Sequence, residues 1–267
     1  MAVALVTGAS SGIGLELARL LARGKYDLVL VGRAREKLKQ LARTLQSAHG
    51  VAAYTFPADL ADPGAPVRLM RALKHEGILP EILVNNAGYG SFGPFHESKI
   101  EGQIGMIQVN VAALVHLTGL CLPAMVARRR GRILNVASIA GFQPGPLMAT
   151  YYATKAFVIS FTEALAEELR GTGVTATALC PGPTRTAFGA RANMIGSRLL
   201  SGHILSVMDA RPVAESGYRA MMRGKVIAIP GAMNHVLPFS SRLVPRVIVR
   251  KVVRLMQARR LRAPRSR

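Results

Sequence analysis

Short apolar segments alternate with longer segments of helical periodicity along most of this chain, and this rhythm restricts the fold more than any other feature. The predicted strands are Val3–Val6, Leu28–Val31, Ala52–Phe56, Ile82–Val84, Arg132–Ala137, Thr175–Cys180 and Val226–Ile229. The predicted helices between them are Gly14–Arg23, Ala34–His49, Pro63–His75, Ser98–Arg129 and Tyr151–Arg170. Strands that are apolar at successive positions are typical of a parallel sheet covered on both faces. The sequence therefore predicts an α/β fold with a doubly wound parallel sheet of about seven strands and helices on both faces.

The chain is expected to form a single domain with a short tail. Its 267 residues are half hydrophobic, which is enough to bury a large core and excludes intrinsic disorder of the body. We predict one domain at 1–241, and a tail at 242–267. Within the domain, the segment 187–225 is rich in Gly, Ser and Met and is predicted to be a loop insertion. Asp62 and Pro63 predict a helix start, as the N-cap residue and the first helical residue.

The formal net charge of +21 is unevenly distributed. Residues 242–267 contain ten basic residues and no acidic one, which leaves +11 for residues 1–241. After Pro245 this tail can form an amphipathic helix with Ile248, Val249, Val252, Val253, Leu255 and Met256 on one arc and Arg246, Arg250, Lys251 and Arg254 on the other. Such a helix can lie on an anionic membrane surface, or it can dock on the body or on a partner subunit. Nucleic acid is not predicted as a partner, because the tail offers neither stacking aromatic residues nor a reading helix.

We predict a cytoplasmic location, with peripheral contact with a membrane surface through 246–267 as the alternative. Ala2–Val6 already belongs to the first strand, which leaves no room for a signal peptide. The uncharged stretches 102–127 and 133–154 contain polar residues and prolines that a membrane-spanning helix tolerates poorly. Cys121 and Cys180 lie in apolar contexts and are too few for a disulfide framework or a zinc site. No metal site is predicted, because the six histidines show no ligand-like spacing.

A glycine-rich segment joins the first predicted strand to the first predicted helix. It reads Thr7-Gly8-Ala9-Ser10-Ser11-Gly12-Ile13-Gly14. Glycine allows positive φ and lets the backbone approach a pyrophosphate, whose charge then faces the N terminus of the helix. A position between strand and helix is the context that such a turn requires. The segment therefore predicts a Rossmann-type sheet and a dinucleotide held by Gly8, Ser10, Ser11, Gly12, Ile13 and Gly14.

The end of the second predicted strand favours NADP(H) over NAD(H). An NAD-binding protein usually places an acidic residue here for the ribose hydroxyls, but this strand ends Val31-Gly32-Arg33, and Arg35 follows. Arginine can bind a 2′-phosphate through charge-assisted hydrogen bonds, whereas a carboxylate would repel it. A solvated charge at a helix start is the alternative explanation for both arginines.

Tyr151 and Lys155 lie four residues apart, which places both side chains on one face of the predicted helix. Ser138 comes just after the fifth predicted strand, and Asn110 lies in the helix before that strand. Each residue has an ordinary structural explanation by itself, as a chance helical pair, a turn residue or a satisfied core amide. Together, behind a dinucleotide turn, they predict an enzyme. Tyr152 has no lysine at the fourth following position and is expected to pack or to line the pocket.

These residues, with the Gly-x-x-x-Gly-x-Gly spacing of the turn, resemble the short-chain dehydrogenase/reductase family, closely over residues 1–190 and loosely beyond. The resemblance implies a catalytic tetrad of Asn110, Ser138, Tyr151 and Lys155. It also implies cofactor contacts from Tyr151 and Lys155 and from three segments that follow strands. These contacts are Asp59 and Leu60; Asn86, Ala87 and Gly88 of the Asn-Asn-Ala-Gly motif; and Pro181, Gly182, Thr184 and Thr186. Thr184 is a small departure, since the family usually has an apolar β-branched residue there.

The implied reaction moves a hydride to or from carbon and a proton to or from oxygen. A free tyrosine, with a pKa near ~10, is a slow acid or base at neutral pH. Lys155 and the positive charge of the oxidised nicotinamide are expected to favour the phenolate of Tyr151 and to lower its pKa. Lys155 is also expected to bind the nicotinamide ribose. Ser138 is expected to donate a hydrogen bond to the carbonyl oxygen, and Asn110 to hold a water that links Lys155 to solvent. The predicted function is an NADP(H)-dependent oxidoreductase that interconverts a carbonyl and an alcohol.

The substrate is predicted to be a lipophilic ketone or a 3-oxoacyl thioester. Apolar residues occupy the segments expected to shape the substrate pocket: Phe92, Phe95, Phe142, Met148, Phe188, Met194, Ile195, Leu199 and Leu200. His203 is a further candidate for the pocket wall. The uncharged helix from Gly102 and the helix carrying Tyr151 favour a homodimer, with a tetramer as the alternative. Two other functions stay open. One is a cofactor-binding regulator or scaffold without turnover, and the other is a basic membrane- or nucleic-acid-binding module.

Overall fold

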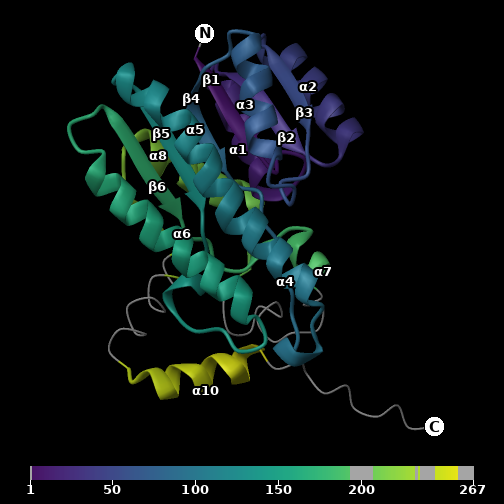
Figure 1. Cartoon of the computed structure of the whole chain (residues 1–267), viewed down its shortest axis with the longest axis vertical. Helices are drawn as coiled ribbons and strands as arrows, with labels where there is room; N and C mark the ends of the chain where they lie inside the picture. The colour runs from purple at the N-terminus through teal and green to yellow at the C-terminus, as the bar shows by residue number, and fades with distance from the viewer. Residues whose placement is uncertain (1, 193–206, 232–233, 235–243, 258–267) are drawn as a thin grey trace.

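Parallel strands form the central layer of the computed structural model, which describes residues 2–192, 207–231, 234 and 244–257 (Figure 1). Within this part of the chain the main sheet has seven strands in the order β3-β2-β1-β4-β5-β6-β9. They are β1 (Val3–Thr7), β2 (Asp27–Gly32), β3 (Ala53–Pro57), β4 (Pro80–Asn85), β5 (Gly131–Val136), β6 (Val174–Leu179) and β9 (Ile227–Ala228). The chain starts in the middle of the sheet, runs to one edge at β3, and returns to β4 to build the other half. The predicted Rossmann-type, doubly wound fold is confirmed.

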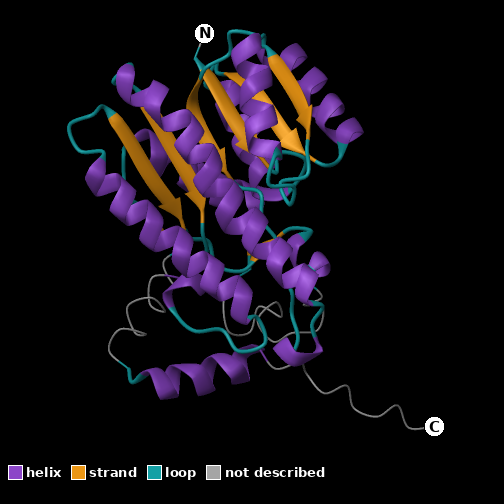
Figure 2. Ribbon diagram, in the orientation of Figure 1, coloured by secondary structure: helices purple, strands orange, loops and turns teal. Residues whose placement is uncertain are grey.

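Helices cover both faces of the sheet (Figure 2). One face carries α1 (Gly12–Arg23), α2 (Arg35–His49) and α8 (Ala210–Met222); the other carries α3 (Ala65–His75), α5 (Ala113–Ala127) and α6 (Ala149–Glu168). α4 (Ile100–Ile107) extends beyond the sheet in line with α5 (Figure 1). Successive residues of a strand point to opposite faces. In β1, Ala4 and Val6 pack with the first group, and Leu5 packs with the second. Two covered faces therefore explain why β1 and β2 are apolar at successive positions.

The predicted strands and helices end within two residues of the observed ones. The start of α3 is wrong in detail. Asp62 does not cap the helix: its Oδ1 accepts the N–H of Gly64 at 2.8 Å in a turn before it, and Gly64 is the N-cap. The proline inside the first turn of the helix is Pro66 and not Pro63. The dipeptides Asp62-Pro63 and Ala65-Pro66 lie close together here, and the prediction placed the helix start at the first of them.

The predicted insertion at 187–225 is shorter than expected, because its second half belongs to the sheet-and-helix core. α8 packs on α1 and buries Val213, Ala214, Gly217, Ala220 and Met221, which share one helical face. Before it, β8 (Met208–Asp209) pairs with β7 (Thr184–Arg185), and Arg185 forms an ion pair with Asp209 at 2.9 Å. The small side chains on the buried face of α8 gave a weak hydrophobic signal. Residues 193–206, with the candidates Met194, Ile195, Leu199, Leu200 and His203, lie outside the described residues.

α4 and α5 are joined by a π-helical turn, Gln108–Ala112, and form one continuous helical segment. In the described chain this is the segment that is long and apolar enough to cross a membrane, with a mean hydropathy of 1.8. It packs instead as a core helix would, because α5 contacts α3 and the strands β4 and β5. Pro123 lies inside α5, where the helix must do without one backbone hydrogen bond. The absence of a membrane span stays a prediction.

Candidate active site

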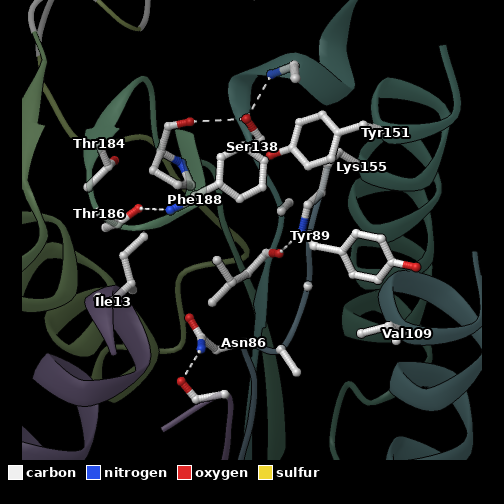
Figure 3. Close-up of a pocket in the computed structure, with 18 of the residues that line it drawn as sticks. Ile13, Asn86, Tyr89, Val109, Ser138, Tyr151, Lys155, Thr184, Thr186 and Phe188 are labelled. Carbon is white, nitrogen blue, oxygen red and sulfur yellow. Dashed lines mark hydrogen bonds between the residues drawn. The ribbon is translucent and has the colours of Figure 1, made fainter. Parts of the chain in front are cut away.

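A cavity of about 710 Å³ lies at the carboxyl ends of the central strands, where the two halves of the sheet meet (Figure 3). Open α/β sheets bind their ligands at this position, and the volume suits a small molecule with its cofactor. All but two of the residues predicted for the site line it. These are Gly8, Ser10, Ser11, Gly12, Ile13, Arg33, Asp59, Leu60, Asn86, Ala87, Gly88, Ser138, Tyr151, Lys155, Pro181, Gly182, Thr184 and Thr186. Gly14 and Asn110 lie behind the wall of the cavity.

The glycine turn is held to the end of β4 by side-chain hydrogen bonds. Asn86 Nδ2 donates to the carbonyl oxygens of Thr7 at 2.9 Å and Gly8 at 3.2 Å. In return, Thr7 Oγ1 accepts the backbone N–H groups of Asn86 and Ala87, each at 3.0 Å. Gly8 has a φ of +66°, and a Cβ there would lie 2.6 Å from Asn86 Nδ2. A Cβ at Gly14 would also collide with Asn86, so this glycine permits close packing rather than ligand contact.

The start of α1 fits the diphosphate of a dinucleotide. Ser11, the N-cap residue, makes no side-chain hydrogen bond to the helix within the described structure. The first N–H groups of α1 are therefore available to a ligand, and the helix dipole favours an anion there. Gly12 and Ile13, the first residues of the helix, line the cavity. The residues present thus fit a nicotinamide dinucleotide.

Arg33 and Asp59 lie side by side where the adenosine end of a dinucleotide is expected. Arg33 Nη1 is 3.9 Å from Asp59 Oδ2, and both side chains are more than half exposed. An exposed ion pair at this distance is weak. β2 lacks an acidic residue at its end, as the sequence indicated, but the tertiary structure brings a carboxylate from the end of β3 to Arg33. Arg35 is exposed at the first residue of α2 and is not part of the cavity wall.

Ser138, Tyr151 and Lys155 come together at the inner end of the cavity (Figure 3). Ser138 follows β5; its Oγ donates to the Pro181 carbonyl at 3.3 Å and accepts the N–H of Ala140. Tyr151 and Lys155 project from the same side of α6, with Lys155 Nζ 5.8 Å from the centroid of the Tyr151 ring. Lys155 is 6% exposed, and its Nζ donates to the Val136 carbonyl at 2.6 Å. Burial lowers the pKa of Lys155 from 10.5 to about 8.

The expected lowering of the Tyr151 pKa is wrong for the protein's own groups. Burial raises the pKa of Tyr151 well above its usual range, and a hydrogen bond with Ser138 only partly opposes this rise. Burial disfavours the charged phenolate, and Lys155 is not among the groups that shift the Tyr151 pKa. Lys155 also points its Nζ at Val136 rather than at the Tyr151 oxygen. The tyrosine is therefore held protonated, as a proton donor must be.

Asn110 lies in the π-helical turn and is 1% exposed. Its Nδ2 donates to the Tyr89 carbonyl at 3.0 Å and to Thr154 Oγ1 at 3.1 Å, and its Oδ1 accepts the N–H of Tyr89 at 3.1 Å. Both amide protons are committed, so a water would have to bond to the remaining lone pair of Oδ1. The side chain thus ties the loop after β4 to α6, one residue before Lys155. Its role in holding a water stays a prediction.

The C-terminal helix α10 (Arg246–Gln257) supplies a wall that the sequence did not predict. Val253, Met256 and Gln257 line the cavity, and Gln257 Nε2 donates to Tyr152 Oη at 2.5 Å. Tyr152 therefore lines the pocket, which is one of the two roles expected for it. The amphipathic pattern of residues 246–256 was the available signal, but it did not say which body residues the helix would meet. Gln257, polar and just beyond the pattern, carried no signal.

The apolar candidates for the substrate pocket divide into several groups. Met148 and Phe188 line the cavity, and the Phe188 ring lies 5.2 Å from that of Tyr151. Phe92 packs behind this wall with Ala140 and Met148, and Phe142 packs in a different cluster under α6. Phe95 is 56% exposed and does not line the cavity. In the described residues no group of three His, Cys, Asp or Glu side chains could hold a metal ion.

Comparison with known proteins gives consistent results. Residues 2–194 match the family model of short chain dehydrogenases. The chain is 41% identical over 176 residues to a very-long-chain 3-oxoacyl-CoA reductase of Pyrenophora tritici-repentis; the match covers 64% of this chain and 51% of that protein. This chain thus spans about half the length of that curated relative. An oxidoreductase of Myxococcus xanthus, described as uncharacterized, is 34% identical over 235 residues, which cover 88% of this chain and 92% of that one.

Two solved structures share the fold over nearly the whole chain. A short-chain dehydrogenase from Sphingobium yanoikuyae in complex with NADPH superposes with a TM-score of 0.80 and 32% identity, over 100% of both chains. A 7beta-hydroxysteroid dehydrogenase superposes with a TM-score of 0.84 and 27% identity, over 94% of this chain and 96% of that one. These matches agree with the glycine turn and the cavity at the carboxyl ends of the strands. This chain belongs to the short-chain dehydrogenase/reductase family.

Proposed function

We propose that this enzyme interconverts a carbonyl and an alcohol on a lipophilic substrate, with NADP(H) as cofactor and Tyr151 as the acid/base residue. The observation that carries the proposal is the convergence of Ser138, Tyr151 and Lys155 with the glycine turn in one cavity. A regulator or scaffold without turnover would have no use for a buried tyrosine and lysine at this position. A basic membrane- or nucleic-acid-binding module would not need the cavity at all.

The side chains of the proposed site have distinct tasks. In the reductive direction the Tyr151 hydroxyl donates its proton to the substrate oxygen as negative charge develops there. Ser138 donates a hydrogen bond to the same oxygen and stabilises that charge, for which its hydroxyl must turn from the Pro181 carbonyl. Lys155 stabilises the phenolate that is left and binds the ribose next to the nicotinamide. The bound nicotinamide supplies the hydride for reduction and accepts it for oxidation.

The preference for NADP(H) is supported by Arg33, which lines the cavity beyond the end of β2. Among the described residues, Asp59 is the one carboxylate that lines the cavity, and the 3.9 Å between it and Arg33 leaves the guanidinium free to take a better partner. A 2′-phosphate can form charge-assisted hydrogen bonds with Arg33 that the distant carboxylate does not make. Solved relatives with NADPH and NADP⁺ support the same choice.

The lipophilic substrate is supported by the wall around Tyr151. Met148 and Phe188 from the body and Val253 and Met256 from α10 surround the space beside the tyrosine with apolar side chains. Relatives named very-long-chain 3-oxoacyl-CoA reductases and a 7beta-hydroxysteroid dehydrogenase are consistent with ketones on large apolar skeletons. A 3-oxoacyl thioester and a polycyclic ketone are therefore the substrate classes that we propose.

We also propose a homodimer that pairs α4, α5 and α6 with their copies. Ile104 on α4 and Phe157 on α6 are 58% and 42% exposed, and Phe157 stacks on Phe161 at 5.9 Å. Light scattering of Ile104→Glu tests this contact: the dimer mass should fall to that of the monomer, and an unchanged mass would contradict it. The cytoplasmic location and the peripheral membrane contact through 246–267 stay predictions.

The function is tested by NADPH oxidation with lipophilic ketones and 3-oxoacyl thioesters. Tyr151→Phe should lower kcat by about 10² to 10⁴, the usual contribution of acid–base catalysis. It should still be stabilised against heat by NADPH, because the glycine turn, Arg33 and Lys155 are unchanged. Tyr152→Phe makes the same chemical change one residue away and should keep most of kcat. Turnover that survives Tyr151→Phe would refute the mechanism, and stabilisation by NADPH without turnover of any substrate would favour the scaffold.

A further inference from the structure

α10 has two different apolar sides, and the body of the protein covers one of them. Val249, Val253 and Gln257 are buried at helical spacing against Ala140, Met148 and Tyr152. The sequence indicated a single apolar arc from Ile248 to Met256. The structure divides that arc, because the helix lies along the rim of the cavity and only part of its circumference can meet the body.

The other apolar side faces away from the body. Ile248, Val252 and Leu255 follow one another at i, i+4 and i+7 and are 50%, 47% and 64% exposed. Val247 is also exposed, but at about 100° per residue it lies between Lys251 and Arg254 and not on this ridge. We call Ile248, Val252 and Leu255 the outer ridge. Figure 1 shows α10 across the end of the molecule opposite the N terminus, with one long side turned away from every other element.

Cations lie on one side of the outer ridge. Lys251 and Arg254 follow the ridge around the helix, and Arg250 and Arg246 lie beyond them. All four are exposed, and α10 has no acidic residue. The described residues before the helix, 244 and 245, are also without charge, and the sequence from 259 to 267 adds five arginines and no acid. α10 thus combines an exposed apolar strip with a border of positive charge alone. Helices of this kind lie in the interface of membranes that carry anionic lipids.

A second copy of the chain fits this surface poorly. Twelve residues at about 1.5 Å each make a helix of about 18 Å, with a width of about 10 Å. The strip thus offers a footprint of about 200 Å², whereas a stable dimer buries about 800 Å² per partner. Two copies paired along the ridge would also bring their cations together without any carboxylate between them. An anionic lipid surface has neither problem.

We propose that α10 docks on an anionic phospholipid surface through the outer ridge, so that the cavity opens beside the membrane. The inner side of the same helix carries Val253 and Met256 into the cavity wall, so one helix would separate the lipid surface from the substrate. A substrate dissolved in the bilayer could then reach Tyr151 along α10. This last step rests on the proposed function; the docking itself does not.

Co-sedimentation of the full-length chain with vesicles tests the docking. The chain should sediment with vesicles of phosphatidylcholine and phosphatidylserine, not with phosphatidylcholine alone, and salt should weaken the binding. Ile248→Ser/Leu255→Ser removes the ridge, and Arg250→Gln/Arg254→Gln removes two cations. Each should lower the partition coefficient by about tenfold or more, since each cation near an anionic surface adds to binding.

Matched controls make these losses specific. Leu79→Ser changes an apolar residue that is 47% exposed, before β4 and away from α10. Arg71→Gln/Lys74→Gln removes two exposed cations from α3. Both controls should sediment like the unchanged chain. Turnover of a water-soluble ketone without vesicles should be the same in all variants, because none of the replaced residues lines the cavity.

Three results would overturn the docking proposal. They are equal binding to neutral and anionic vesicles, binding that the ridge and charge variants leave unchanged, and no binding to vesicles at all. If binding is absent and Ile248→Ser/Leu255→Ser lowers the mass in light scattering, a second copy covers the ridge instead. Absence of NADPH-dependent turnover in every variant, with vesicle binding intact, would refute the proposed function and leave the docking standing.

Discussion

Lys155 should make this protein more stable in alkaline solution than at neutral pH. Its ammonium is 6% exposed, and burial lowers its pKa to about 8 from 10.5. Between pH 8 and 10.5 the unfolded chain binds a proton at this lysine that the folded chain has lost. The free energy of unfolding therefore rises with pH in this window. The burial cost is fully present below pH 8 and disappears as pH approaches 10.5.

The variant Lys155→Met isolates this contribution. For a shift from 10.5 to about 8, the linkage relation gives a rise of about 2 to 3 kcal/mol in the unfolding free energy between pH 7 and pH 10. Lys155→Met lacks the titrating group, so the difference between the two proteins should change by that amount. The hydrogen bond to the Val136 carbonyl is lost at every pH in this range and contributes a constant offset.

Urea unfolding in steps of pH, with a reducing agent, measures both curves. Tyr151 and Cys121, whose pKa values burial raises, titrate in both proteins and should cancel in the difference. Cys180 would not cancel, because Lys155 lowers its pKa, so both proteins carry Cys180→Ala. Lys155→Arg is the control, because its charge persists at pH 10 and its curve should lack the rise. Two curves that run parallel from pH 7 to pH 10 would refute the reasoning, since Lys155 would then titrate alike in the folded and unfolded chain.

Three other predictions test the walls of the cavity. Arg33→Asp should raise KM for NADPH by about tenfold or more and leave KM for NADH nearly unchanged; equal losses for both cofactors would contradict the role of Arg33. Asn86→Asp replaces a donor that serves two carbonyl oxygens by a carboxylate that can only accept, so calorimetry should show a loss of about 2 kcal/mol and a weaker stabilisation by NADPH. A melting temperature unchanged by this substitution would show that the glycine turn does not depend on it. Gln257 Oε1 is buried without a hydrogen-bond partner in the described residues, and Gln257 Nε2 donates to Tyr152. Tyr152→Phe would leave both polar atoms of the buried amide without a partner, whereas Gln257→Leu removes the amide. Gln257→Leu should therefore cost less stability than Tyr152→Phe. The reverse order in thermal unfolding would mean that the contact between α10 and Tyr152 is not formed in solution.

Local patterns were enough to predict the fold and most of the cavity. Strands covered on both faces are apolar at most successive positions, so the sheet was visible as short, mainly apolar segments. The glycine turn depends on residues next to one another in the chain, and Tyr151 and Lys155 share a face because a helix repeats every 3.6 residues. These features need only the geometry of one element, and the structure places them as the spacing indicated.

Such local patterns could not predict contacts between segments that are far apart in the sequence. Asp59 comes to Arg33 because β3 is the neighbour of β2, and Gln257 meets Tyr152 across 105 residues of chain. The small residues on the buried face of α8 pack because Leu179 of β6 lies close to Gly217, which hydrophobicity alone does not report.

The sequence by itself determined which residues are candidates for the chemistry, because their types and spacings are local properties of strands, turns and one helix. The tertiary structure alone decided the environment of those residues. Burial holds Tyr151 protonated and lowers the pKa of Lys155. The side-chain amide of Asn110 forms hydrogen bonds with the loop after β4 and with α6. α10 completes the wall of the cavity with one side and exposes another side to solvent. Solvent exclusion and hydrogen-bond partners depend on every element packed around a group, so they follow only from the assembled fold.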